Sequence, residues 1–280
     1  MKIVRYRHED GLRTGLLAAD RVIDAADVAP ALGNLAMALT GEGRRRLGAA
    51  LSLTAPATDI AQLALAAPLA DGARIFCIGL NYKTHVSETG RDLPAQPSVF
   101  LRTPESVVGP GAAMVRPTAS DCFDFEGELA VVIGRAGHRV AEADALAHVG
   151  GYTCFNDGSL RDFQKFSVTA GKNFDSSGAI GPWIVTSDEI PDPAALSLTT
   201  RLNGVEVQRS ATDLLIYPIP RLISYISQFS RLRPGDVIAT GTPAGVGARR
   251  TPPLWMKPGD VVEVDVSGIG TLRNPITSAA

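Results

Sequence analysis

Short β-type segments dominate the chain from residue 73 onward and constrain its fold more than any other feature. Each is a run of β-branched or aromatic residues bounded by turn residues, as is typical of strands. The runs are RIFCIG, SVFLR, GELAVVIG, GYTCFND, LSLTTRLNG, DVIATG and DVVEVDV. These strands outnumber the helices and do not alternate with them, which argues against a doubly wound parallel sheet. We therefore expect an α+β fold that is mainly β.

Two segments of this part have helical patterns. One is AEADALAHV (141–149), which stops at a pair of glycines, and the other is PRLISYISQFSRL (220–232), which has Pro in its first turn. Leu222, Ile226 and Phe229 share one face of the second helix, and Pro234 follows its end.

Residues 1–72 form a separate small unit in this interpretation. Short alternating segments precede a helical-looking region from Leu35 to Leu51, which indicates a small α+β domain. The composition changes in APLADGAR (67–74), so we place a domain boundary near residue 72. The second domain is then 73–280, and the first contains no motif that indicates chemistry.

Composition excludes several classes of function. The 280 residues include 27 basic and 29 acidic side chains with no long basic run, so the charge footprint of a nucleic-acid or anionic-membrane binder is missing. The first residues are charged, unlike a signal peptide, and no apolar run could span a bilayer. We expect a soluble, cytosolic protein. The three cysteines form no C-x-x-C pair, so each is interpreted as a small core residue.

Two glutamates open the most apolar strand of the chain, in DFEGELAVVIG. Residues two apart in a strand point to one face, so Glu126 and Glu128 lie side by side and repel unless a cation balances them. Carboxylates without nearby His or Cys favour Mg²⁺, Mn²⁺ or Ca²⁺ over zinc. Asp157 supplies a third ligand if its strand pairs with this one. The alternative is a solvated strand end with exposed glutamates, but the apolar LAVVIG that follows indicates a strand covered on both faces.

A histidine and a glutamate stand three residues apart in IGLNYKTHVSE. On a helical turn this spacing brings His85 and Glu88 together. The carboxylate would raise the basicity of the imidazole and fix its tautomer, as a general base requires. A surface ion pair is the alternative interpretation.

Other polar residues follow the third acid of the cluster. A helical turn in NDGSLRDFQ would set Asp157, Arg161 and Gln164 along one side, and Lys172 stands among small residues, as suits an anion site. The glycine-rich loop ATGTPAGVG (239–247) could form an anion-binding nest or be only a structural turn.

Taken in order, eight motifs make the chain resemble the fumarylacetoacetate hydrolase family over about residues 73–276. They are GLNYKTHVSE, FLRTPESVVGPG, FEGELAVVIG, GYTCFNDGSLRDFQ, GKNFDSSGAIGPW, RLNGVEVQ, LRPGDVIATGTPAGVG and MKPGDVVEVDVSGIGTLRNPI. The resemblance implies a mixed β-roll or β-sandwich catalytic fold and a homodimer. It also implies Mg²⁺ or Mn²⁺ bound through Glu126, Glu128 and Asp157, with Ca²⁺ as a substitute in a crystal.

The same resemblance implies roles for further residues. The family's catalytic His–Glu pair matches His85 and Glu88, and Lys172 and Gln164 match groups that stabilise an oxyanion. Substrate contacts are implied for Arg161, Thr242, Tyr82 and Arg102. Arg102 stands where many members have Lys, which keeps the charge but changes its shape.

The resemblance points first to a metal-dependent hydrolase that cleaves a C–C bond in a 2,4-dioxo acid. Its substrate would be acylpyruvate-like, fumarylpyruvate-like or a diketo sugar acid from aromatic or sugar-acid breakdown, attacked by water that His85 deprotonates. The alternative is a decarboxylase or isomerase of the same family, acting on oxaloacetate or on dicarboxylic products of homoprotocatechuate cleavage. A non-catalytic protein that binds a metal or a small acid is a third hypothesis.

Overall fold

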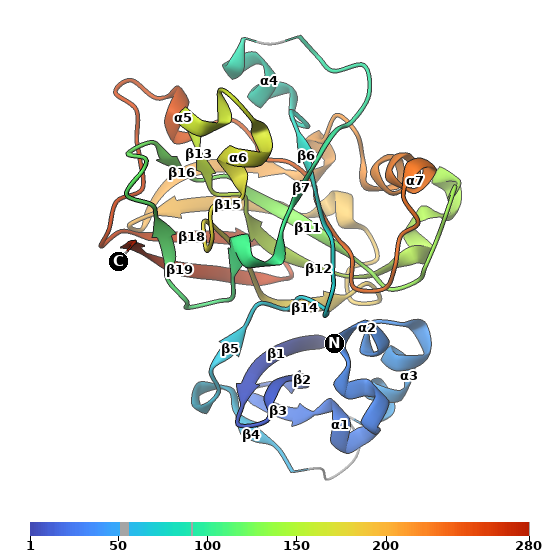
Figure 1. The fold of residues 1–280 in the computed structure, drawn as a ribbon. Coiled ribbons are helices and arrows are strands. Elements are labelled where there is room, and N and C mark those ends of the chain that lie inside the picture. The colour runs from blue at the N-terminus through green and yellow to red at the C-terminus, as the bar shows by residue number, and fades with distance from the viewer. Residues whose placement is uncertain (51–55, 91, 280) are drawn as a thin grey trace.

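A computed structural model describes residues 1–50, 56–90 and 92–279, so Leu51 at the end of the expected helical region lies outside it. Figure 1 shows a small N-terminal part beside a larger part rich in strands. The N-terminal part consists of β1 (Lys2–His8), β2 (Gly11–Ala18), β3 (Arg21–Asp24), α1 (Ala25–Val28), the 3-10 helix η1 (Pro30–Gly33), α2 (Leu35–Ala38), α3 (Gly41–Ala50), β4 (Thr58–Asp59), η2 (Ile60–Gln62) and β5 (Leu65–Ala66).

The larger part holds the strands expected from the sequence. Its strands are β6 (Ile75–Gly79), β7 (Ser98–Arg102), β8 (Val107–Val108), β9 (Met114–Arg116), β10 (Phe123–Asp124), β11 (Gly127–Ile133), β12 (Val149–Asn156), β13 (Ser159–Leu160), β14 (Gly178–Thr186), β15 (Ser197–Leu202), β16 (Val205–Ala211), β17 (Val237–Ala239), β18 (Val261–Val266) and β19 (Gly270–Ser278). Its helices are α4 (Lys83–Thr89), η3 (Pro104–Ser106), η4 (Glu142–His148), α5 (Arg161–Gln164), α6 (Val168–Lys172), η5 (Pro193–Ala195), η6 (Thr212–Leu214), α7 (Ile219–Phe229) and η7 (Gly247–Arg249).

One large mixed sheet runs through both parts, in the order β4-β3-β2-β1-β14-β12-β11-β17-β6-β7. β1 pairs with β14 in the register Lys2↔Val185, so backbone hydrogen bonds join the N-terminal part to the rest. A second sheet, β16-β15-β18-β19-β9, packs against the first. The expected fold class is confirmed, whereas the boundary near residue 72 stays a prediction.

The strand that follows the two glutamates is buried along its whole length, as predicted. Leu129 and Val131 of β11 pack in the core between the two sheets. Ala130 and Val132 face the opposite way, into a core shared with N-terminal residues such as Leu39. Because both faces are covered, β11 is a rigid support for whatever stands at its head.

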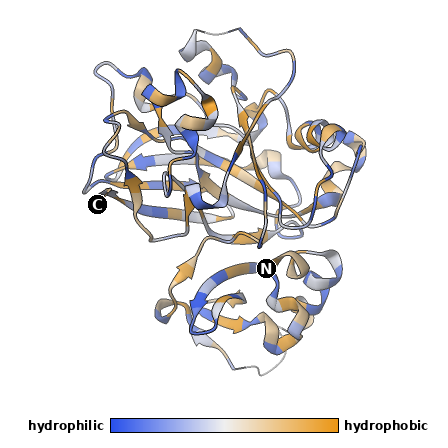
Figure 2. Ribbon diagram, viewed as in Figure 1, coloured by the Kyte–Doolittle hydropathy of each residue, from blue (hydrophilic) through white to orange (hydrophobic). Residues whose placement is uncertain are grey.

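The helix predicted over residues 220–232 is shorter than expected, because α7 ends at Phe229. Leu222 and Ile226 of α7 are fully buried, whereas Phe229, predicted on the same face, is 60% exposed. Phe229 is the last helical residue and packs edge-on against Tyr225 at the margin of the core. Figure 2 shows hydrophobic and hydrophilic positions alternating around α7.

A central strand was missed. β14 pairs with both β1 and β12, yet Gly178, Gly181 and Pro182 within it are typical of turns. The predicted helix over 141–149 is present as the 3-10 helix Glu142–His148.

The contact between the N-terminal part and the β11–β12 hairpin depends on a glycine. A Cβ on Gly134 would lie 2.5 Å from Leu39 O and 2.6 Å from Gly150 Cα. We predict that Gly134→Ala lowers the free energy of unfolding by about 1–3 kcal/mol, because both neighbours are backbone and must move. Urea unfolding measures the change.

A Cβ on Gly41 meets no atom within 4 Å, so Gly41→Ala is the matched control. It is expected to change the free energy of unfolding by less than about 1 kcal/mol. Equal losses in both variants would contradict the close-approach argument.

Candidate active site and metal centre

A cavity of about 430 Å³ is lined by residues of α4, α5 and α6 and by the end of β6. Its volume lies within the range of ligand pockets, about 300–1,000 Å³. The polar side chains in its wall come from distant parts of the chain. They include His85, Glu126, Asp157, Arg161, Gln164, Lys172 and Thr242.

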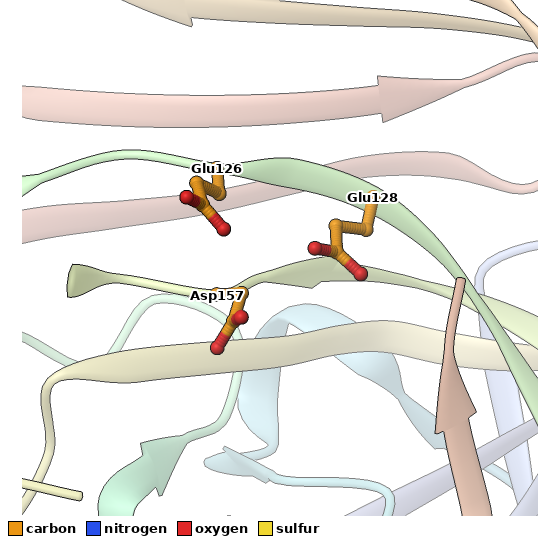
Figure 3. A group of neighbouring side chains, drawn as sticks. All are labelled: Glu126, Glu128 and Asp157. Carbon is orange, nitrogen blue, oxygen red and sulfur yellow. The ribbon is translucent and has the colours of Figure 1, made fainter. Parts of the chain in front are cut away.

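Three acidic side chains meet at the head of the β11–β12 hairpin. The two strands are antiparallel, with Gly127 opposite Asn156, and the Asp157 amide donates to Glu126 O at 2.8 Å. The three carboxyl groups each offer an oxygen within 4.8 Å of the others. Figure 3 shows Glu126 and Glu128 turned toward the side on which Asp157 lies. All three are buried, with exposures of 6%, 2% and 1% in that order from Glu126.

Three cationic side chains surround this acidic cluster. Lys172 Nζ donates to Glu126 Oε2 at 2.7 Å and to Asp157 Oδ2 at 2.5 Å. Arg102 Nη1 lies 2.7 Å from Asp157 Oδ1, and Arg161 Nη2 lies 2.6 Å from Glu126 Oε1. Within the described ranges, Glu128 has no cationic partner within 4 Å and accepts only the Gly241 amide, at 2.8 Å.

The protonation of the two glutamates reflects this difference. Burial by itself would raise the pKa of Glu126, but Lys172 and Arg161 hold it at about 2. Burial and the carboxylates of Asp157 and Glu126 hold the pKa of Glu128 well above its usual range. Among the described residues, Glu128 is therefore the acid of this cluster without a protein cation as partner, and a divalent cation fits beside it. The oxygen-only donors of the cluster suit Mg²⁺, Mn²⁺ or Ca²⁺.

The histidine and glutamate of α4 form a pair at the cavity. His85 Nδ1 lies 3.2 Å from Glu88 Oε2, and the Gly245 amide donates to Glu88 Oε1 at 2.9 Å. Glu88 is thus held by the glycine-rich loop while it orients the imidazole. His85 is only 7% exposed and lines the cavity, which does not fit the surface ion-pair alternative.

Asp124, to which sequence reasoning gave no ligand role, organises one wall of the cavity. Its carboxylate accepts Arg161 Nε at 2.8 Å and the amides of Gly247 and Ala248 at 2.7 and 3.0 Å. Arg161 Nη1 also donates to Gln164 Oε1 at 2.9 Å. The only sequence signal for Asp124 is its even spacing from Glu126, which puts an acid on the buried face.

Gln208 is a second residue that the sequence did not single out. Its Oε1 accepts the Gly127 amide at 3.0 Å, and its Nε2 donates to Thr242 Oγ1 at 2.9 Å. Thr242 Oγ1 in turn donates to Gly127 O at 3.0 Å. A buried amide thus ties the segment between the two glutamates to the glycine-rich loop. Its one sequence signal is its place as the last residue of the motif RLNGVEVQ, because most of β16 is exposed or half-buried.

Some residues expected to contact substrate have other positions. Tyr82 is buried and does not line the cavity. Arg102 lies behind the wall, where it donates to Asp157, Gly158, Ser106 and Ser177, so it supports the acid cluster.

The ammonium group of Lys172, expected at an oxyanion, donates to three protein oxygens: Glu126 Oε2, Asp157 Oδ2 and Asp157 O. The hydroxyl of Thr242, expected to bind substrate, already bridges Gln208 and Gly127.

Comparison with known proteins finds a family and close structural neighbours. Residues 74–277 match the family model described as Fumarylacetoacetate (FAA) hydrolase C-terminal. The chain is 34% identical to the mitochondrial oxaloacetate tautomerase FAHD2A of Bos taurus, over 99% of this chain and 91% of that protein. It is similar to a fumarylacetoacetate hydrolase of Exiguobacterium antarcticum, with a TM-score of 0.84, 34% identity and full coverage of both chains. It is also similar to a maleylpyruvate hydrolase of Sphingobium sp. SYK-6 solved with manganese(II) and pyruvate, with a TM-score of 0.83, 27% identity and full coverage of both chains.

We predict that Glu128→Gln weakens Mn²⁺ binding by at least about 100-fold, because changes outside the ligand set alone cost 10- to 100-fold. The metal-free variant is expected to unfold at the same temperature as the wild type or higher, since one of three mutually repelling acids is gone. Titration calorimetry and thermal unfolding measure the two effects.

Glu105 is exposed and is not one of the clustered acids, so Glu105→Gln is the control and should bind Mn²⁺ like the wild type. Retention of tight Mn²⁺ binding by Glu128→Gln would show that this carboxylate is not a ligand.

We predict that Arg102→Gln lowers the free energy of unfolding by about 3–5 kcal/mol, because it breaks a buried ion pair and leaves Asp157 with Lys172 alone. Mn²⁺ affinity should fall by about 10- to 100-fold, since Asp157 is no longer held in place. Arg116→Gln is the control, because Arg116 pairs with Asp121 at the surface. That variant should change neither quantity, and equal effects of the two substitutions would contradict the role of Arg102.

Proposed function

The chain belongs to the fumarylacetoacetate hydrolase family, and from that premise we propose that it is a metal-dependent keto–enol tautomerase of a 2-oxo dicarboxylic acid. Oxaloacetate is the first candidate substrate, because several relatives at 34–41% identity are named oxaloacetate tautomerases. The observation that carries the proposal is the buried oxygen cluster beside a His–Glu pair on one cavity.

A tautomerase needs to stabilise negative charge on the 2-oxo oxygen and to move one proton. Glu126, Glu128 and Asp157 would hold the divalent ion. When bound, this ion supplies a Lewis acid that polarises the oxo group and stabilises the charge that develops on it.

His85 moves the proton in this proposal. Glu88 accepts the hydrogen bond from Nδ1–H, which leaves Nε2 as the basic nitrogen. Nε2 takes a proton from C3 of the keto form, Glu88 stabilises the imidazolium, and the proton returns to the oxo oxygen to give the enol. No water is consumed and no C–C bond breaks.

Arg161 holds the carboxylate next to the oxo group. Its Nη2 is paired with Glu126 Oε1 at 2.6 Å, and its Nη1, which donates one N–H to Gln164 Oε1, has a second N–H for a ligand in the cavity that Arg161 lines. The Gln164 amide beside it lines the same cavity. Planar guanidinium groups suit carboxylates because they donate two parallel hydrogen bonds.

The C–C hydrolase expected first from the sequence is the second candidate. The same His–Glu pair could deprotonate a water molecule, and a maleylpyruvate hydrolase is among the structural neighbours. A decarboxylase would use the same polarised oxo group. A purely binding protein is disfavoured, because it would not require His85 beside Glu88.

Location and assembly also remain proposals. Within the described residues, no helix is long and apolar enough to cross a membrane. A cytosolic homodimer is our proposal from the sequence and the family resemblance, although several relatives are named as mitochondrial.

We predict that the protein with Mg²⁺ or Mn²⁺ accelerates the conversion of enol-oxaloacetate to its keto form and loses this activity in excess chelator. His85→Gln should lower kcat by about 10²- to 10⁴-fold, the usual contribution of a general base, with unchanged Mn²⁺ affinity. Loss of enol absorbance measures the rate.

His138→Gln removes an exposed histidine outside the cavity and should leave the rate unchanged. Cleavage of acetylpyruvate or fumarylpyruvate without tautomerase activity would favour the hydrolase instead. Full activity of His85→Gln would exclude His85 as the base.

A further inference from the structure

Two cationic side chains line the cavity but form no ion pair with the carboxylates of the acid cluster. Lys165 follows the last residue of α5, and Arg249 is the last residue of η7. Both are exposed, and neither side chain forms an ion pair or hydrogen bond with any residue that the structure describes. Arg161 and Lys172, by contrast, are both paired with carboxylates.

Arg250, the next residue along the chain, differs from Arg249 because its side chain is hydrogen-bonded. Arg250 donates from Nε to Gly245 O at 3.1 Å and from Nη2 to Val207 O at 2.5 Å. Arg250 therefore stabilises its own loop. The Arg249 guanidinium forms no such hydrogen bond with the described residues, so its N–H groups are available to a ligand.

The backbone that carries Arg249 is firmly placed. Asp124 accepts the amides of Gly247 and Ala248, and the Leu254 amide donates to Gly247 O at 3.0 Å. Asp124 is the same carboxylate that holds Arg161 Nε. The buried carboxylate of Asp124 thus holds Arg161 at the acid cluster. It also holds the backbone segment that carries Arg249 at the cavity wall.

The remainder of the cavity wall suits the carbon chain of a ligand. Phe100, Val168, Val246 and Trp255 contribute apolar surface. Asp162 is an acidic residue of this wall outside the proposed metal ligands, and its Oδ1 already accepts Ser120 Oγ at 2.6 Å and the Phe163 amide at 3.1 Å. It is therefore engaged with its own segment.

We propose that Arg249 and Lys165 form a second anion subsite, which binds the distal carboxylate of a dicarboxylic 2-oxo acid. The proposal rests on the proposed function for the other end of the ligand, whose oxo and carboxylate groups are held at the acid cluster and by Arg161. Arg249 supplies a planar fork that matches a carboxylate, and Lys165 adds a second positive charge. This subsite selects dicarboxylic acids over 2-oxo acids with an apolar tail.

The test compares two five-carbon ligands that differ at the distal end. Binding of 2-oxoglutarate and 2-oxopentanoate to the Mn²⁺-loaded protein is measured by titration calorimetry. The wild type should prefer 2-oxoglutarate, and Arg249→Gln should weaken 2-oxoglutarate by about 10- to 100-fold, as for hydrogen bonds to charged groups. It should leave 2-oxopentanoate unchanged. Lys165→Gln should act in the same direction with a smaller effect, because an exposed ammonium is well solvated.

Arg233→Gln is the control, since Arg233 is exposed and lies outside the cavity wall. The subsite is excluded if the wild type shows no preference for 2-oxoglutarate, or if Arg249→Gln weakens both ligands equally or neither. The measurement requires no turnover. A protein that lacks tautomerase activity but shows the expected selectivity would overturn only the proposed function.

Discussion

The burial of three carboxylates at the head of one β-hairpin is the constraint on which the rest of the site depends. Charges removed from water are costly unless they are balanced, and like charges add repulsion. Lys172, Arg102 and Arg161 supply this balance for Glu126 and Asp157, while Glu128 has only a backbone amide. The unbalanced glutamate is what makes the cluster suited to a divalent ion.

The fold provides the rigidity that this arrangement requires. β11 is covered on one face by the second sheet and on the other by a core that includes the N-terminal part. Two buried polar side chains, Asp124 and Gln208, connect the hairpin to the glycine-rich loop. One hydrogen-bonded framework therefore holds the carboxylates of the acid cluster, the Glu88 side chain that orients His85, and the loop that carries Arg249 of the proposed distal subsite.

The cavity wall combines three kinds of side chain, and this combination favours a particular kind of ligand. Acidic oxygens stand with His85 and Arg161, apolar side chains such as Phe100 and Trp255 contribute to the same wall, and Lys165 and Arg249 add positive charge. A short 2-oxo acid with a second carboxylate complements all three kinds of side chain. Proton transfer and water attack share the same base, so the ligand that fits decides the chemistry more than the base does.

The sequence alone determined the features that depend on local spacing. Strand alternation put Glu126 and Glu128 on one face, the apolar run after them predicted a strand covered on both sides, and helical spacing paired His85 with Glu88. The tertiary structure decided what depends on distant partners. Asp124 meets the Ala248 amide across 124 positions, and Arg102 meets Asp157 across 55. No local period encodes such pairs, because they form only when separate strands and loops pack. For the same reason the central position of β14, the burial of Tyr82 away from the cavity and the engagement of Lys172 by protein oxygens could be seen only in the folded chain.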